Sequence, residues 1–229
     1  MPRASIVHVG VNKSHGFLGP IFGDGSFRFI PLHEKYPSQE SWKYENLGLS
    51  KWTPTDWVYA HYDPEFRTYT WGDHKNKRTF CTRQLSKGDF VFFIASLAYN
   101  QSKRVAREPW VSDYGMYVIG YFELKEIPQE ENISYPIPLE LKRKYVNNAH
   151  VKRDYTKYRP PSFLIFKGSE NSRPLNVAIP FSCGSKPNEL ARKAIPNVNP
   201  KKPRWWSDTV VMRDGVEAIF HEISKRNRL

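Results

Sequence analysis

Histidine and acidic side chains that could recognise a nucleotide base occur in residues 59–66. His61 and Asp63 stand two positions apart, and the Asp63-Pro64 pair indicates a turn. Carboxylate and imidazole groups can hydrogen-bond to base edges, and loops often carry function. Asn12, which follows an expected strand, is a third candidate for such contacts. The structural alternative is that His61 is a satisfied structural histidine and that Asp63 caps its own turn.

A second combination of residues could support catalysis. Asp113 precedes an expected strand, and Glu123 and Lys125 stand at its end, which resembles the Asp…Glu-x-Lys arrangement of metal-dependent nucleases. In that chemistry two carboxylates hold Mg²⁺, and the lysine helps to orient the attacking water. Because Glu-x-Lys is common in strands by chance, the nuclease is kept as an alternative, and we expect a protein that is not an enzyme.

Other signals for a metal ion or a cofactor are missing from the sequence. The seven histidines show no His-x-x-x-His spacing, and two cysteines, Cys81 and Cys183, are too few for a cysteine-rich zinc site. The glycine-rich residues 16–25 lack the Lys-Ser or Lys-Thr pair of a phosphate-binding loop. The sequence therefore predicts neither a metal ion nor a cofactor.

Positive charge is concentrated in one part of the chain. The 229 residues carry a formal net charge of +12, and residues 138–206 contain 15 Lys or Arg against four acidic residues. Phosphates attract such clusters, and the aromatic content of 15% provides rings on which bases can stack. A solvated basic face is the alternative. The residues expected to bind phosphate are Lys201, Lys202, Arg204, Lys152, Arg153, Arg104 and Arg107.

The elements that must position these residues are mostly strands. Apolar patterns predict strands at residues 5–11, 27–30, 90–95, 115–124, 163–166 and 175–179. The aromatic-rich residues 59–66 and 69–73 are expected to be loops, because Asp-Pro and Gly-Asp punctuate them. Helices are predicted at residues 138–148 and 189–194 and, most clearly, from Asp214 onward.

This order of elements predicts one α+β domain over residues 1–229, a mixed β-barrel flanked by helices and ending in a C-terminal helix. It would carry an inserted loop at 97–114 and a basic segment at 138–206. No apolar run approaches the roughly 18 residues of a membrane span, and the first residues lack a signal-peptide pattern. We expect a cytoplasmic protein, with its oligomeric state left open.

Two sets of residues resemble known families. Residues 88–96 and 115–124 resemble the central strand pair of PUA-like domains, the EVE, ASCH, YTH and SRA groups. More specific motifs resemble the nucleotide modification associated domain family, third type, over roughly residues 5–180, and the loop at 97–114 and the basic residues 184–206 depart from its pattern. These motifs are Gly19-Pro20-Ile21-Phe22, Asp24-Gly25, Phe29-Ile30-Pro31, Ala60-His61-Tyr62-Asp63-Pro64-Glu65 and Ala149-His150.

The resemblance implies a PUA-like fold that binds nucleic acid carrying a modified base, for example a methylated one. Several PUA-like groups take such a base into an aromatic-lined pocket, where stacking and edge hydrogen bonds offset the cost of extruding it. Ser96 and Asn100 match the place of the base-facing loop in YTH-like domains, and Trp71 and Trp110 could cage the base. The expected base pocket therefore comprises Trp71, Asp63, Ser96, Asn100, Asn12, His61 and Trp110.

The expected partner is nucleic acid. Modified DNA is favoured, but the sequence does not separate it from RNA, and a module for structured RNA is a further alternative to the modified-base reader and the nuclease.

Overall fold

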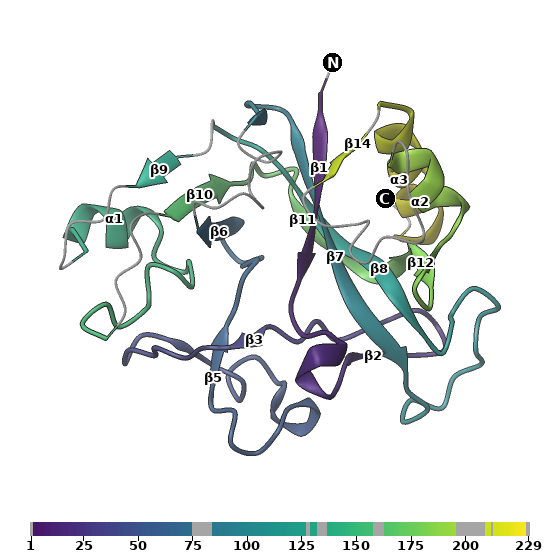
Figure 1. Ribbon diagram of the computed structural model, residues 1–229, viewed down its shortest axis with the longest axis horizontal. Coiled ribbons are helices and arrows are strands. Elements are labelled where there is room, and N and C mark those ends of the chain that lie inside the picture. The colour runs from purple at the N-terminus through teal and green to yellow at the C-terminus, as the bar shows by residue number, and fades with distance from the viewer. Residues whose placement is uncertain are drawn as a thin grey trace.

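The computed structural model describes residues 2–74, 84–126, 129–131, 137–157, 163–195, 209–211 and 213–227. Its largest unit is a six-stranded sheet in the order β11-β8-β7-β1-β14, with β2 paired to the end of β7 (Figure 1). The strands of this central sheet are β1 (Ala4–Val9), β2 (Gly19–Ile21), β7 (Phe90–Tyr99), β8 (Tyr114–Glu123), β11 (Arg173–Pro180) and β14 (Thr209–Val211).

The central strand β7 is apolar on both faces because both faces are buried. It runs parallel to β1 and antiparallel to β8, with Phe90 opposite Ala4 on one side and Glu123 on the other. Phe92 belongs to the apolar cluster on one face, and Phe93 belongs to the cluster on the opposite face. Such burial explains the continuous apolar run that predicts this strand.

Two helices cover the face of the sheet that contains Phe92. They are α2 (Glu189–Ala194) and α3 (Arg213–Asn227), which lie side by side (Figure 1). Ile219 and Ile223 of α3 are fully buried in this cluster; burying an isoleucine side chain contributes roughly 1.5–3 kcal/mol. The Asn227 side chain bonds to the backbone of Val177, which fixes the end of α3 to β11.

Three smaller sheets complete the fold, and two of them position the site described below. These two are β3-β5-β4, made of β3 (Leu32–His33), β4 (Trp42–Lys43) and β5 (Tyr59–His61), and β6-β10-β9, made of β6 (Thr70–His74), β9 (Gln129–Glu131) and β10 (Phe163–Lys167). The third pairs β12 (Ser182–Cys183) with β13 (Lys186–Pro187). The remaining elements are α1 (Leu139–Lys144) and the 3-10 turns η1 (Lys13–His15) and η2 (Ser50–Trp52).

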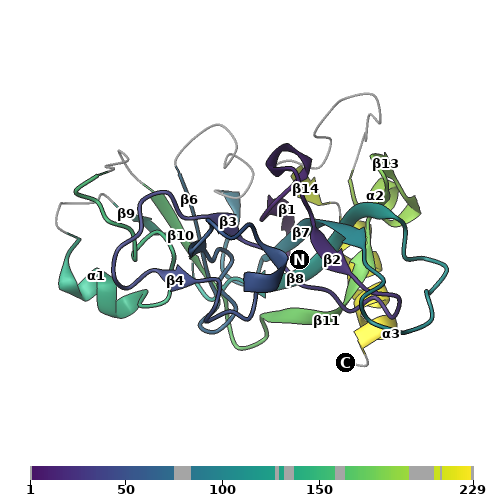
Figure 2. The ribbon, with the colours of Figure 1, turned by 90° about the horizontal axis from the view of Figure 1, so that it is seen from below.

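The smaller sheet β6-β10-β9 and the helices α2 and α3 lie on different sides of the central sheet. The elements β6, β9, β10 and α1 lie on one side of the central sheet, and α2 and α3 lie on the other (Figures 1 and 2). Phe166 of β10 and Trp71 of β6 pack with Phe93 in the cluster on the face opposite the helices. Apolar contacts therefore attach the sheet β6-β10-β9 to the central sheet.

The α+β class is confirmed, together with the C-terminal helix and the strands near 90–95, 115–124, 163–166 and 175–179. The strands that the structure describes form separate sheets and no closed barrel, so the PUA-like barrel stays a prediction. The loop at 97–114 shortens to residues 100–113, because β7 extends to Tyr99 and β8 begins at Tyr114.

Four local predictions are wrong in whole or in part. Residues 59–66 are not all loop, because Tyr59–His61 form β5 and pair with β3 and β4. Residues 27–30 form no strand, because after the turn at Asp24-Gly25 only Phe27 forms an isolated bridge, with Ile21. Residues 69–73 are not a loop, because Thr70–His74 form β6 and pair with β10. The helix predicted at 138–148 ends at Lys144, where Tyr145 leaves the helical conformation.

Among the helices of the described residues, none is both long and apolar enough to cross a membrane.

Candidate functional site

A tight turn after β5 fixes the first part of the site. β5 pairs with β3 and β4 on its two sides, and the chain then turns through a cis peptide bond between Asp63 and Pro64. The buried Glu65 carboxylate accepts hydrogen bonds from the backbone N–H and hydroxyl of Thr68 at 3.0 and 2.5 Å. The turn leads into β6, where the Gly72 N–H donates to the Asp63 carboxylate at 3.1 Å. This backbone hydrogen bond fixes the orientation of the Asp63 carboxylate.

A second segment, residues 148–155, places His150 against this turn. The side-chain oxygen of Asn148 accepts hydrogen bonds from the backbone N–H groups of His150 and Val151 at 3.0 and 3.4 Å. The His150 ring stacks on Phe163, with ring centroids 5.6 Å apart. Gly72 leaves room for it, because a Cβ atom there would lie 2.5 Å from the Cδ2 atom of His150.

Three polar side chains converge where the two segments meet. His150 Nε2 lies 3.2 Å from Asp63 Oδ2, and His61 Nε2 lies 3.9 Å from the same oxygen. His61, Asp63 and His150 are 9%, 8% and 3% exposed, and the atoms that each could offer to a metal ion all lie within 4.8 Å of one another. We call these three residues the His–Asp–His cluster.

Glu34 and Arg153 hold the outer side of this cluster. The Nδ1 atom of His61 lies 2.6 Å from Glu34 Oε2, and the Arg153 Nε–H donates to both carboxylate oxygens of Glu34 at 3.0 Å. Burial favours a higher pKa for Glu34, but the hydrogen bond with His61 and the charges of His61 and Arg153 outweigh it and lower that pKa to about 2. Burial lowers the pKa of His61 below its usual value, in spite of Glu34. Glu34 is therefore charged at neutral pH.

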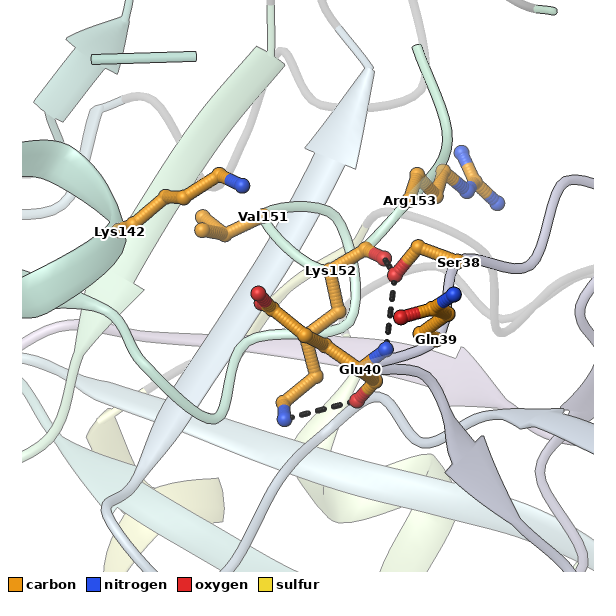
Figure 3. A pocket seen from close by; sticks show the side chains of 7 residues that line it. All are labelled: Ser38, Gln39, Glu40, Lys142, Val151, Lys152 and Arg153. Carbon is orange, nitrogen blue, oxygen red and sulfur yellow. Dashed lines mark hydrogen bonds between the residues drawn. The ribbon is translucent and has the colours of Figure 1, made fainter. Parts of the chain in front are cut away.

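A basic pocket adjoins the cluster. Its volume is about 260 Å³, and it is lined by Ser38, Gln39, Glu40, Lys142, Val151, Lys152 and Arg153 (Figure 3). Lys152 is held there by a bond from its ammonium group to the Glu40 carbonyl at 2.9 Å. Its ammonium group also lies 5.0 Å from the ring centre of Trp42. Val151 follows His150 in the chain, and Arg153 bonds to Glu34. The residues 150–153 therefore contribute both to the cluster and to the lining of the pocket.

The structure brings together two of the seven residues expected in a base pocket, His61 and Asp63. Trp71 is 4% exposed, and its ring packs on Phe166 and Phe93, so it lies in the core instead of facing an open cavity.

The other four predicted residues make contacts away from the His–Asp–His cluster. The Asn12 side chain caps η1, and the Asn100 side chain accepts a hydrogen bond from the Ser102 N–H. Ser96 bonds to His8 at 2.9 Å, and Trp110 lies beneath the guanidinium of Arg226. Their roles in base recognition stay predictions.

The expected phosphate contacts are also distributed. Lys152 and Arg153 line the basic pocket. Arg104 and Arg107 are exposed in the loop 100–113, where Arg107 pairs with Asp113 at 2.8 Å. Lys201, Lys202 and Arg204 lie outside the described residues.

The residues of the nuclease alternative are not assembled. Asp113 immediately precedes β8 and Glu123 is its last residue, so nine residues of extended strand lie between them. At about 3.4 Å per residue the two carboxylates stand roughly 30 Å apart, too far to share an ion. Glu123 instead accepts a hydrogen bond from the Asn171 side chain at 2.7 Å.

Sequence reasoning missed Glu34 as a site residue and cited His150 only within a family motif. Both come from segments distant from the turn after β5, and neither forms a recognisable spacing with His61. The family motifs contained a signal for His150, because two of them, the His61-x-Asp63 pair and Ala149-His150, carry a histidine and resemble the same family.

The fold and this site define an α+β protein with a buried His–Asp–His cluster beside a basic pocket. The model of the family nucleotide modification associated domain 3 matches residues 3–213 of the chain, a range that includes the cluster and the pocket. The chain therefore belongs to this family. No curated protein and no solved structure matches it.

Proposed function

We propose that this protein binds nucleic acid that carries a modified base, with modified DNA as its preferred partner. Its family links the chain to modified nucleotides. The resemblance to PUA-like domains, several of which take a splayed base into a pocket, supports the same proposal.

The observation that carries the proposal is the basic pocket. Lys142, Lys152 and Arg153 line one hollow, and anionic phosphates are the natural complement of such a group of cations. The ring of Trp42 contacts the ammonium group of Lys152. It also contacts the guanidinium of Arg67, whose Cζ atom lies 4.6 Å from the ring centre. An aromatic ring beside cations is the combination on which single-stranded nucleic acids bind, by stacking and charge together.

The proposed function is recognition without a reaction. Cleavage of a plasmid by the purified protein in Mg²⁺ or Mn²⁺, modified or not, would contradict this part of the proposal and favour an enzyme.

The test measures the affinity of the full chain for matched oligonucleotides, DNA and RNA, with and without base methylation, at several salt concentrations. The double substitution Lys142→Ala and Lys152→Ala removes two cations from the pocket. On duplex DNA it should reduce the slope of log affinity against log salt by about two, since each phosphate contact contributes about 0.9. The loss should be similar for all sequences.

The matched control is Lys87→Ala, an exposed lysine in the turn before β7. It should leave both the affinity and the salt slope unchanged. Equal affinities of the wild-type protein for modified and unmodified strands would overturn recognition of the modification. An unchanged slope in the double variant would remove the pocket from the binding surface.

A further inference from the structure

We propose that His61, Asp63 and His150 bind one divalent transition-metal ion, which joins the turn after β5 to the segment that forms the wall of the basic pocket. The ligand atoms are His61 Nε2, Asp63 Oδ2 and His150 Nε2. The metal site stands on the geometry of these residues, independently of the proposed function.

The separations of these atoms suit a shared ion. Metal–ligand bonds of roughly 2.0–2.1 Å in tetrahedral geometry place neighbouring ligand atoms about 3.3 Å apart. The pair Asp63 Oδ2 and His150 Nε2 is already at 3.2 Å, and His61 Nε2 is 3.9 Å from Asp63 Oδ2. The third separation, between the two histidine ligand atoms, is no more than 4.8 Å. The His61 ring must therefore move towards both Asp63 and His150 for one ion to reach all three atoms.

The hydrogen bond to Glu34 prepares His61 as a ligand. A carboxylate only accepts hydrogen bonds, so His61 Nδ1, 2.6 Å from Glu34 Oε2, carries a proton and donates it. The ring nitrogen left to bind an ion is Nε2, which lies 3.9 Å from Asp63 Oδ2. A carboxylate behind the distal nitrogen of a histidine is the usual outer support of a metal ligand, and Arg153 fixes this carboxylate in turn.

The rings and the carboxylate are held in place before any ion binds. Phe163 stacks on His150, the rings of His61 and His150 pack edge to face at 4.7 Å, and the Gly72 N–H holds Asp63. The positive charge of an ion would compensate the nearly buried Asp63 carboxylate, where low polarity makes such pairing strong. The alternative for the same atoms is a direct hydrogen bond between His150 and Asp63 without an ion, and the experiment below separates the two.

The donor set indicates the class of metal. Two imidazole nitrogens and one carboxylate oxygen suit Zn²⁺, Co²⁺ or Fe²⁺, whereas Ca²⁺ and Mg²⁺ prefer sites made of oxygen alone. Three protein ligands leave further coordination positions on the ion.

The ion would organise the basic pocket through the chain. His150 is followed directly by Val151, Lys152 and Arg153, which line the pocket. Fixing His150 to the turn after β5 therefore fixes this wall. If the protein binds nucleic acid as proposed above, removal of the metal should weaken that binding.

The experiment strips the full-length protein with a chelator and titrates it with Co²⁺, whose d–d absorption reports nitrogen and oxygen ligation, and with Zn²⁺ by calorimetry. We expect one equivalent to bind and the melting temperature to rise with the concentration of either ion, but not with Ca²⁺ or Mg²⁺. Asp63→Asn and His150→Gln should abolish the Co²⁺ spectrum. Glu34→Gln should weaken binding roughly 10- to 100-fold, as loss of an outer support does.

The matched control is His221→Gln, which alters an exposed histidine of α3 and should bind Co²⁺ as the wild type does. A wild-type protein that binds neither Co²⁺ nor Zn²⁺ overturns the proposal, and so does an unchanged spectrum in Asp63→Asn. If the ligand variants do not fold, as judged by circular dichroism, the wild-type stoichiometry and the Glu34→Gln affinity decide the question. Metal binding that leaves oligonucleotide affinity unchanged would overturn only the link to the pocket.

Discussion

Helix α3 meets the central sheet through Ile219, Ile223 and Phe220. By contrast, β5 and the turn after it meet residues 148–155 through polar side chains, namely His61, Asp63, His150 and Arg153, with Glu34 from the residue after β3 bonded to His61 and Arg153. Both junctions are mostly buried. The first depends on contact area, which has no direction and which neighbouring side chains can partly replace. The second depends on hydrogen bonds and charges, whose geometry must be satisfied group by group. The polar junction is therefore the more sensitive of the two to changes that preserve volume.

The largest expected effect comes from removing one member of the polar junction. Glu34→Leu takes the acceptor from the His61 Nδ1–H and leaves the Arg153 guanidinium beside an apolar side chain. Breaking a buried ion pair in this way costs about 3–5 kcal/mol of the free energy of unfolding. Urea denaturation measures this loss.

The matched control for this substitution is Glu45→Leu at an exposed position, which should change stability by less than about 0.5 kcal/mol. A loss for Glu34→Leu as small as that of the control would remove the distinction between the two junctions.

A half-buried imidazole in the central sheet, that of His8, extends the comparison to the pH dependence of stability. Burial, with a smaller contribution from His15, lowers the pKa of His8 to about 4, against 6.5 for the free side chain. Between these values the unfolded chain binds a proton that the folded chain does not, so stability falls as the pH falls from about 6.5 to about 4. The group accounts for up to about 3 kcal/mol of this loss.

His8→Gln keeps a polar group near Ser96 but cannot titrate. Unfolding free energies measured at neutral pH and near pH 4.5 should differ less in this variant than in the wild type. An equal difference in both proteins would show that other groups cause the acid sensitivity.

The smallest effect is expected at the apolar junction. Ile219→Val removes one buried methyl group from the α3 interface and should cost about 0.5–1.5 kcal/mol. Because no titrating or metal-binding group is involved, the loss should be the same at every pH and with or without Zn²⁺. A loss that varies with pH or with Zn²⁺ would show that the two junctions are coupled through the sheet.

Local sequence patterns predict the elements of the apolar junction well. β7 and β8 follow from runs of apolar residues, and α3 follows from the spacing of Val216, Ile219, Phe220 and Ile223, because burial on a regular element repeats at short intervals. The same reasoning places Trp71 in a loop, since the partner that makes it a strand residue, Phe166 of β10, is distant in the chain.

The residues of the polar junction are only partly predictable from the sequence. His61 and Asp63 are identified as site residues because they lie together beside an Asp-Pro turn. Their partners Glu34, His150 and Arg153 come from other segments, and tertiary contacts alone bring them to the site. No spacing within a single segment encodes such a constellation.

The pairing of β1 has a consequence for synthesis of the chain. Ala4 lies opposite Phe90 of β7 on one side and opposite Val211 of β14 on the other. Because β1 is synthesised before both of its partners, its two edges stay unpaired until β7 and then β14 have been made. Nascent chains that stop before residue 209 should expose an open strand edge, which is a template for aggregation. We expect truncated forms of this protein to need chaperones more than the full chain does.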